Sequence, residues 1–538
     1  MFFSKAQKRF AAVFTAAVML ASILGTAAVS AAAAPKLSKK SVTIKKGRTV
    51  IVRVKNAGRK VRWSSSNKKI AAVVKIKGTR KGIATIKGKK KGKCVIRAKI
   101  GKKILKCRVT VKAAGGTAWP PKEESEWDRK IETRKLSGQS VDRAASYPKL
   151  ENAGTSFGET ESRAMAGFAV DLFRKTYEAE QAEGGDKRPN VLISPDSVIT
   201  ALTMTANGAN GDTLSQMTGT LAPGLTQEQL NGSVAKLHDR LTGQKNFIYS
   251  VANSIWAKKG TLDVKPAFLQ INKNYHNAAF YEADFDLNTV NDMNNWAYNN
   301  TRNMIDKIIE GPFSDDARMV LMNAVAFESK WAEIYGPGQR VPNKPFTTAA
   351  GAVQSVNMLY GRENDYLEVA GGKAFAKYYR GGKVAFVGML PPEGKSLAAY
   401  VAGMTGADFM DAWKNRQQIP VNVCFPEFKY DYGVSMKDTL QAMGMTLPFT
   451  DDADFFGISD PTPETPYGLK ISDVLHKTHI ELDRKGTKAA AVTAVVMEKA
   501  GAMPGEIKEV YLDRAFVYAL VDTETGMPLF LGTVGSVE

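Results

Sequence analysis

The C-terminal part of the chain alternates between helix-like and strand-like spacing of its apolar residues. From Ala164 to Glu178 apolar side chains recur every three or four residues, which predicts an amphipathic helix. Apolar and β-branched runs at 247–253, 320–325 and 384–390 predict strands, and strands dominate from Val421 onward. Helices grouped early, with long strands among and after them, favour an α+β fold over a doubly wound one.

The N-terminal part shows short β-branched runs separated by Gly, Lys and Asn. Between Leu37 and Val111 these runs recur about every 8–13 residues, which predicts a small all-β sandwich with Trp63 as its single large aromatic residue. The segment resembles the group 2 bacterial Ig-like domain. The matching motifs are Leu37-Ser38, Lys46-Gly47, Trp63 to Asn67, Ile70 to Val73 and Cys107 to Val111.

Residues 1–34 have the pattern of a secretory signal peptide. Lys5, Lys8 and Arg9 precede an apolar run from Phe10 to Val29, and small residues follow it. A membrane anchor is the alternative, because the run is long enough to cross a bilayer. We expect a secreted, extracellular protein that can stay associated with the cell surface.

Composition then changes twice more along the chain. Residues 35–112 form the predicted sandwich, and 157–538 have the composition of one large mixed domain. Between them, 113–156 combine Gly-Gly, Pro-Pro and mixed charge, which predicts a linker with at most a transient helix.

Positive charge is concentrated in residues 35–112. Of the 75 Lys and Arg, 29 lie there without any Asp or Glu, and three more precede them. The rest of the chain holds 43 basic and all 53 acidic side chains, a net charge of about −10. Residues 36–112 are therefore expected to bind a polyanion such as a cell-wall polymer or a glycan, with a solvated spacer as the alternative. Export and the lack of a row of aromatic residues argue against nucleic acid.

Three cysteines are too few for a disulfide scaffold. Cys94 and Cys107 flank a turn at Gly101 between two predicted strands, so they either form a bridge after export or remain free thiols. Cys424 lies in an apolar run and is expected to be a small core residue.

The segment from Gly486 to Met497 contains no Pro, no aromatic residue and no Asn or Asp. As a strand inside a sheet it would bury every second side chain and leave Lys488 on the other side. An Ala-rich helix or an edge strand is the alternative. The inward set would be Thr487, Ala489, Ala491, Thr493, Val495 and Met497.

Across about 380 residues the large domain resembles the serpins, because seven short motifs follow one another in that family's order. They include Asn190 to Ser197 with Ala201-Leu202, Gly208-Ala209 and Thr213, Met322 to Phe327 with Trp331, Phe425 to Phe428, Leu440 to Met445, Ile471 to Lys477 and Pro528 to Gly532. The resemblance implies an α+β fold with large antiparallel sheets, about nine helices and an exposed reactive loop.

The same resemblance implies a monomeric inhibitor of serine proteases. The protease serine would attack the loop and form an acyl-enzyme, and the cut loop would insert into the main sheet. The hinge of this loop would be Gly486, Thr487, Ala489, Ala490, Ala491 and Thr493. The sheet-opening region would be Ser194, Ser197, Asn323, His476 and Trp331. The chain departs from the family at Arg484, Lys485 and Lys488, where acidic residues are usual.

The family's usual spacing places the scissile bond after Ala500, before Gly501. The segment is longer than is common, so Lys499, Ala502 and Met503 are further candidates. Small residues favour an elastase-like or subtilisin-like target, whereas Lys499 would favour a trypsin-like one. A non-inhibitory, serpin-like binding protein is the remaining alternative.

No sequence motif indicates an enzyme. The chain has four His and lacks the G-x-S-x-G, H-E-x-x-H, phosphate-loop and C-x-x-C patterns. His476 and His479 have the spacing of metal ligands, but side chains three residues apart on a strand point to opposite faces. We expect neither a metal nor a cofactor.

Overall fold

The computed structural model describes residues 34–45, 49–56, 58–77, 82–112, 132–138, 140–148, 157–184, 190–463, 465–466, 468–487 and 507–537. The chain divides into two compact units, Met1–Glu123 and Glu124–Glu538, called the small unit and the large unit below. The apolar run of the predicted signal peptide lies outside the described residues.

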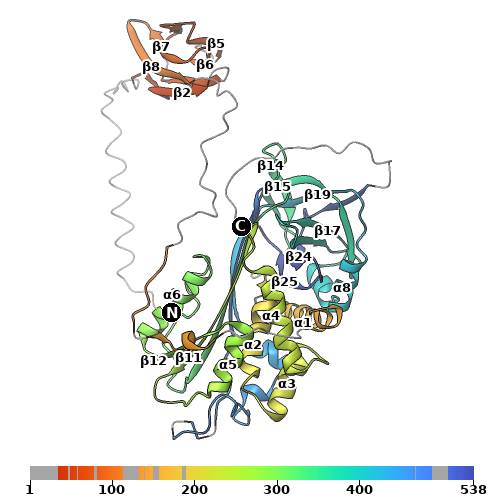
Figure 1. Cartoon of the computed structure of the whole chain (residues 1–538). Coiled ribbons are helices and arrows are strands. Elements are labelled where there is room, and N and C mark those ends of the chain that lie inside the picture. The colour runs from red at the N-terminus through yellow and green to blue at the C-terminus, as the bar shows by residue number, and fades with distance from the viewer. Residues whose placement is uncertain are drawn as a thin grey trace, which may run out of the picture. The chain divides into compact units, whose positions relative to one another are not determined.

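The small unit is a sandwich of two four-stranded sheets, as its alternating pattern predicts. One sheet has the order β1 (Lys36–Leu37), β3 (Thr49–Lys55), β6 (Ile83–Gly88), β5 (Ala71–Lys77). The other has the order β2 (Ser41–Lys45), β8 (Lys103–Lys112), β7 (Gly92–Ile100), β4 (Val61–Ser65) (Figure 1). Both sheets contribute to one core, for example Val52 and Ile86 from the first and Ile96 and Val109 from the second. The assignment to the Ig-like family stays a prediction.

Cys94 and Cys107 are buried free thiols on β7 and β8. The register places Cys94 opposite Val109 and Cys107 opposite Ile96, so the cysteines are diagonal neighbours. Diagonal positions lie roughly 7–8 Å apart, farther than the roughly 4.4–6.8 Å between Cα atoms that a disulfide spans. The candidate bridge is therefore absent here, and burial raises the pKa of the Cys107 thiol.

The large unit combines nine α-helices, counted over its described residues, with three sheets. The helices are α1 (Glu159–Gly184), α2 (Pro195–Ala206), α3 (Gly211–Leu221), α4 (Gln227–Leu241), α5 (Pro266–His276), α6 (Leu287–Asn300), α7 (Leu397–Ala402), α8 (Gly406–Lys414) and α9 (Lys437–Ala442). Within the described ranges none of them is both long and apolar enough to span a bilayer.

The main sheet has seven strands and is long in its centre. Its order is β20 (Phe428–Ser435), β21 (Leu475–Asp483), β22 (Gly486–Thr487), β13 (Met319–Lys330), β11 (Phe247–Lys258), β12 (Ala279–Ala283), β9 (Val141–Asp142). Helix α6 lies alongside β11 and β12 (Figure 1). The strands predicted at 247–253 and 320–325 lie within β11 and β13.

Two further sheets complete the large unit. The six-stranded sheet has the order β10 (Leu192–Ile193), β25 (Pro528–Val534), β24 (Phe516–Asp522), β18 (Val384–Leu390), β17 (Gly372–Tyr378), β16 (Asp365–Val369). The four-stranded sheet has the order β14 (Arg340–Thr347), β15 (Val353–Glu363), β19 (Val421–Pro426), β23 (Lys508–Tyr511). Cys424 is buried on β19, as expected of a core residue.

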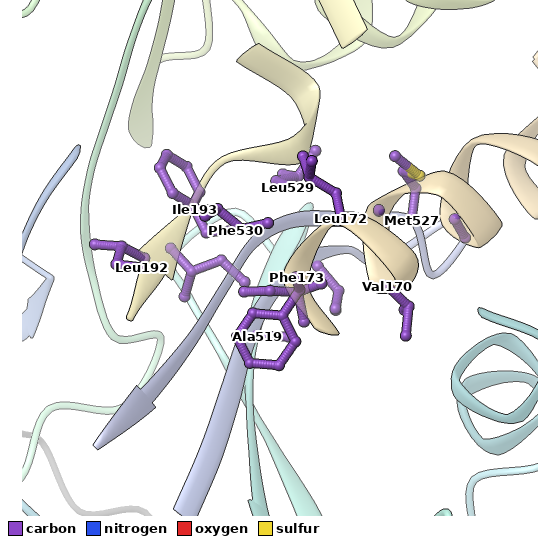
Figure 2. Packing of buried hydrophobic residues seen from close by; sticks show 14 of the residues in the cluster. Val170, Leu172, Phe173, Leu192, Ile193, Ala519, Met527, Leu529 and Phe530 are labelled. Atoms are coloured by element: carbon purple, nitrogen blue, oxygen red, sulfur yellow. The ribbon is translucent and has the colours of Figure 1, made fainter. Parts of the chain in front are cut away.

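The predicted helix at 164–178 lies within α1, whose apolar side chains enter the core. Figure 2 shows Leu172 and Phe173 of α1 gathered with Ile193 of β10 and with Leu529 and Phe530 of β25. Burying an aliphatic or aromatic side chain of this size contributes about 1.5–3 kcal/mol. This packing fixes the position of β10 and β25 of the six-stranded sheet against α1.

Part of the segment predicted to be a linker belongs to the large unit. Strand β9 pairs antiparallel with β12 at the edge of the main sheet. Asp292 on α6 accepts hydrogen bonds from the backbone N–H of Ser137 at 2.7 Å and from the hydroxyls of Ser137 and Ser140 at 2.6 and 2.8 Å. Residues 132–148 are therefore held against the large unit, because their charged and small polar composition satisfies polar groups of α6 and β12.

Candidate functional site

The first two hinge residues of the predicted reactive loop form strand β22 (Gly486–Thr487) inside the main sheet. Gly486 pairs with Lys330 on one side and Asp483 on the other, and Thr487 pairs with Ser329 and Leu482. Strand β22 is antiparallel to both neighbours, β13 and β21. The chain thus turns back from β21 and starts a new central strand.

Gly486 occupies a position with no room for a side chain. A Cβ atom there would lie 2.1 Å from the carbonyl oxygen of Ser329 and 2.7 Å from the Cα of Lys330. Its φ of +154° is also an angle that residues with side chains rarely adopt. The close approach of the backbones depends on glycine.

Thr487 points into the core, on the side that the period-two pattern assigns to the inward set. Its exposed fraction is 3%, and its hydroxyl shares a hydrogen bond of 2.5 Å with the phenol of Tyr379. The Tyr379 ring stacks on Trp331, with ring centroids 4.4 Å apart, and burial raises the pKa of Tyr379. The hinge residue Thr487 therefore packs against the stacked pair Tyr379 and Trp331.

The turn before β22 is fixed by the side chain of Asp483 and by Trp331. The Asp483 carboxylate accepts hydrogen bonds from the N–H groups of Lys485 at 2.7 Å and Gly486 at 3.2 Å. Trp331 donates its backbone N–H to Lys485 at 2.8 Å and its indole N–H to the carbonyl of Asp483 at 3.0 Å. Desolvation raises the pKa of the Asp483 carboxyl, and these N–H donors partly offset the rise.

The remaining loop residues lie outside the described part of the chain. These are the hinge candidates Ala489, Ala490, Ala491 and Thr493 and the scissile-bond candidates Lys499, Ala500, Gly501, Ala502 and Met503. Their roles stay predictions.

Beyond β22, the described strands β13 and β21 that flank it are not paired with each other. Along their described lengths β13 and β21 share no backbone ladder with each other, because β22 separates them at one end. A cavity of about 700 Å³ lies at the other end, between α2 and residues 308–318 and next to Asn323 of β13 and His476 of β21. Over the described residues the facing edges of β13 and β21 are therefore not paired with each other beyond β22.

Ser194, Ser197, Asn323 and His476, which the sequence groups by resemblance, lie in one buried network. The backbone N–H of Ser194 donates to Nε2 of His476 at 3.0 Å, and its hydroxyl donates to the carbonyl of Leu529 at 3.0 Å. Since Nε2 accepts, His476 is neutral in this arrangement, and burial lowers its pKa to about 4. The imidazole links β21 to the start of α2.

Asn323 makes the corresponding link from β13. Its side-chain oxygen accepts from the hydroxyl of Ser197, and its amide donates to Asn253 of β11 at 2.7 Å. Asn253 in turn donates to the carbonyl of His276 at 2.7 Å. The strands on both sides of the gap are thus tied to α2 and α5 through side chains that can exchange partners.

Trp331 lies apart from this network. It follows the end of β13, eight residues beyond Asn323 and so about 26 Å along the strand. The resemblance assigns Trp331 to the point where the loop enters the sheet, and its contacts are with the hinge turn and Tyr379.

Several residues of the site were not singled out from the sequence. Lys377 forms an ion pair of 2.7 Å with Glu363 and lies over the ring of Tyr335, with desolvation raising the pKa of Glu363. Tyr379 and Asn253 were missed as well. Asn253 has a usable signal, a polar amide within an apolar strand, but nothing local marks Tyr379 or Lys377.

No group of three or more potential metal ligands occurs in the described residues. His479 pairs with Asp431 at 2.6 Å, while His476 is buried against Ser194. The two histidines serve different partners.

Comparison with known proteins gives the same assignment as the geometry. Residues 163–537 match the family model described as Serpin (serine protease inhibitor). Iripin-8 of Ixodes ricinus is 28% identical over 375 residues, which cover 66% of this chain and 90% of that protein. Neuroserpin of Homo sapiens is 27% identical over 380 residues, covering 68% and 90%. The crystal structure of tengpin, a thermophilic serpin in its native state, is 36% identical with a TM-score of 0.67, covering 74% of this chain and 100% of that one.

The matched range contains the hinge at Gly486 and Thr487, the Ser194–His476 and Ser197–Asn323 links, and all strands of the large unit's three sheets except the edge strand β9. Members of this family are protease inhibitors and not enzymes. The chain belongs to the serpin family of serine protease inhibitors.

Proposed function

We propose that the protein is a secreted suicide inhibitor of serine proteases. The protease serine oxygen attacks the scissile carbonyl carbon, the peptide bond breaks, and the amine of the following residue leaves with a proton. The loop remains bound to the protease as an ester. Insertion of the loop between β13 and β21 then traps this acyl-enzyme before water hydrolyses it.

The observation that carries this proposal is the position of β22. Two residues of the loop already pair with β13 and β21, and the described flanking strands are parted below them. An inserting strand would gain backbone hydrogen bonds on both sides and bury its alternate small side chains. The inward placement of Thr487 supports the same register for Ala489, Ala491 and Thr493.

Secretion and target choice rest on sequence alone. The residue pattern of 1–34 supports export, and Ala500 and Ala502 support an elastase-like or subtilisin-like target. A trypsin-like target through Lys499 is the alternative, and a non-inhibitory binding protein is the second one.

The test is to incubate the full-length secreted protein with subtilisin, elastase or trypsin and to separate the products in SDS. We expect a covalent complex with subtilisin or elastase that survives denaturation. A complex with trypsin alone would assign the scissile bond to Lys499, and cleavage without any complex would assign the non-inhibitory alternative. Mass spectrometry of the released C-terminal peptide then identifies the bond.

We also propose that the small unit holds the inhibitor at a polyanionic surface. The support is the 29 Lys and Arg of residues 35–112, which have no acidic partner in that segment. Retention on cells at low salt, and its loss when residues 35–112 are deleted, tests this second role.

A further inference from the structure

The two sheets of the small unit differ in how their cations are paired across neighbouring strands. In the sheet β2-β8-β7-β4 the strands bury one face, and their exposed positions alternate with buried ones along β7 and β8. Most of the exposed positions are basic. We call the following set the basic face: Arg62 on β4, Lys93, Arg97 and Lys99 on β7, and Lys106 and Arg108 on β8.

Like charges lie directly opposite one another on this face. The register places Arg97 opposite Lys106 and Arg62 opposite Lys99, and Arg108 is diagonal to Arg97. Such pairs destabilise a sheet, and no carboxylate exists in residues 35–112 to separate them. Neighbouring strands lie about 4.8 Å apart and alternate residues about 6.8 Å apart, so the cations form a dense two-dimensional array.

The other sheet, β1-β3-β6-β5, pairs its charges differently. Arg53 and Lys77 lie opposite Ile83 from its two neighbouring strands, Lys75 is opposite Thr85, and Lys87 is opposite Thr49. Ile51, 44% exposed, is also opposite Thr85. One like-charge pair, Lys36 with Lys55, occurs at the edge strand β1. Over the described residues, the basic face thus has two directly opposed pairs of cations and the other sheet has one.

The neutral positions of the basic face narrow the chemistry of its partner. Beside the cations stand hydroxyl side chains, Ser41 and Thr43 on β2 and Ser64 on β4. Two apolar residues share the face, Val95 opposite Arg108 and Ile104, 47% exposed, opposite Lys99. Trp63, the single aromatic residue of 35–112, packs into the core between the sheets. The face therefore has no aromatic surface on which a nucleobase or a sugar ring could stack. It offers Arg and Lys donors for tetrahedral oxyanions and hydroxyl groups for polar links between them.

We propose that the basic face binds a linear polyol phosphate, a flexible acyclic chain with repeated phosphodiesters. The proposal rests on the anchoring role given above and assigns it to one sheet. Successive phosphates lie along and across β7 and β8 and neutralise the opposed pairs Arg97–Lys106 and Arg62–Lys99. Binding depends on the density of cations on this face, so the affinity falls as salt screens their attraction to the phosphates.

The test compares two triple variants of the full-length secreted protein. Arg97→Gln, Lys106→Gln and Arg108→Gln remove three charges from the basic face, and Arg53→Gln, Lys55→Gln and Lys87→Gln remove three from the other sheet. Lipoteichoic acid with a poly(glycerol phosphate) backbone is immobilised as the probe. Affinity is measured at about 0.05 M and about 0.5 M salt.

We expect the basic-face variant to bind about tenfold more weakly at low salt, the control less than about twofold, and all proteins to be released at high salt. The basic-face variant should melt at the same or a higher temperature, because a like-charge pair is lost. Equal losses in both variants would overturn the assignment to this face and leave anchoring intact. Tighter binding to heparin or single-stranded RNA would overturn the polyol phosphate chemistry. A wild-type protein that binds none of these polymers would overturn anchoring as well, while complex formation with protease is scored separately.

Discussion

The hydroxyl of Thr487 and the phenol of Tyr379 share a hydrogen bond of 2.5 Å in the interior of the large unit. The two residues are 108 positions apart in sequence, and Thr487 is the last described residue of the predicted reactive loop's hinge. This bond joins the hinge to the aromatic pair Tyr379–Trp331. It holds the start of the inserting strand before any protease acts.

Removing this bond from either side should weaken the fold by a similar amount. Tyr379→Phe leaves the buried Thr487 hydroxyl unpaired, which costs about 1–3 kcal/mol, and Thr487→Val leaves the phenol unpaired. The double variant should cost less than the sum of the single ones, because both partners are then apolar. Urea unfolding of the three variants measures the coupling. Strictly additive losses would show that the contact carries no interaction free energy.

A charged residue at the inward hinge position should convert the inhibitor into a substrate. Thr487→Arg would bury a guanidinium where 3% of the side chain is exposed and the threonine hydroxyl is paired with the neutral phenol of Tyr379. Insertion then becomes slower than deacylation, so the loop is cut and the protease is released. The measurement is the ratio of cleaved inhibitor to SDS-stable complex. Thr347→Arg, at an exposed position of β14, is the matched control and should keep the complex.

Any side chain at Gly486 should force β22 away from β13. The Cβ of Gly486→Ala would overlap the Ser329 carbonyl, and overpacking of this kind costs about 1–3 kcal/mol. We expect lower stability in urea together with more substrate-like cleavage. Gly219→Ala, inside α3 where a Cβ has open space, should keep complex formation and raise the stability by at most about 1 kcal/mol, because alanine favours a helix over glycine. Inhibition by the Gly486 variant with wild-type stoichiometry would contradict the geometry described here.

The sequence predicts the hinge better than its surroundings, for a physical reason. Period-two alternation places Thr487 inward without any knowledge of its neighbours, because adjacent residues of a strand always face opposite ways. The lack of space at Gly486 depends on the Ser329 carbonyl, and the partner of Thr487 comes from the turn after β17. Contacts between such distant segments leave no local pattern.

For residues 132–138 and 140–148 the local pattern indicates a linker, whereas the structure has them packed on the large unit. Their charge and small residues are typical of linkers, but Asn295, Asn299 and Asn303 donate side-chain hydrogen bonds to the carbonyls of Lys135, Arg134 and Glu132. The usable pattern lay in the partner segment: Asn295 and Asn299, four residues apart, lie on one side of α6, and Asn303 follows beyond its end. Composition of the segment alone could not reveal it.

The large unit should become less stable as the pH is lowered, partly because of His476. Its folded pKa of about 4 is below the ordinary 6.5, so the unfolded state binds more protons between these values. The contribution of the neutral His476 to the free energy of unfolding is fully present above pH 6.5. It is lost as the pH falls toward 4, and the loss is about 3 kcal/mol at most. His476→Gln retains an acceptor for the Ser194 N–H but does not titrate. Urea unfolding at several pH values should give the variant a smaller slope, with part remaining because burial also lowers the pKa of His276 to about 3.

The docking of residues 132–142 should depend on one carboxylate. Asp292 is buried and accepts three hydrogen bonds from Ser137 and Ser140, so Asp292→Ala removes all three bonds and should cost about 1–3 kcal/mol. Asp306→Ala is the control, since that side chain is 74% exposed and its ion pair with Arg134 is worth less than about 1 kcal/mol. Limited proteolysis followed by N-terminal sequencing should find new cuts between 132 and 142 in the first variant and none in the second. Unchanged protection in Asp292→Ala would mean that β9 pairing with β12 is sufficient to hold the segment.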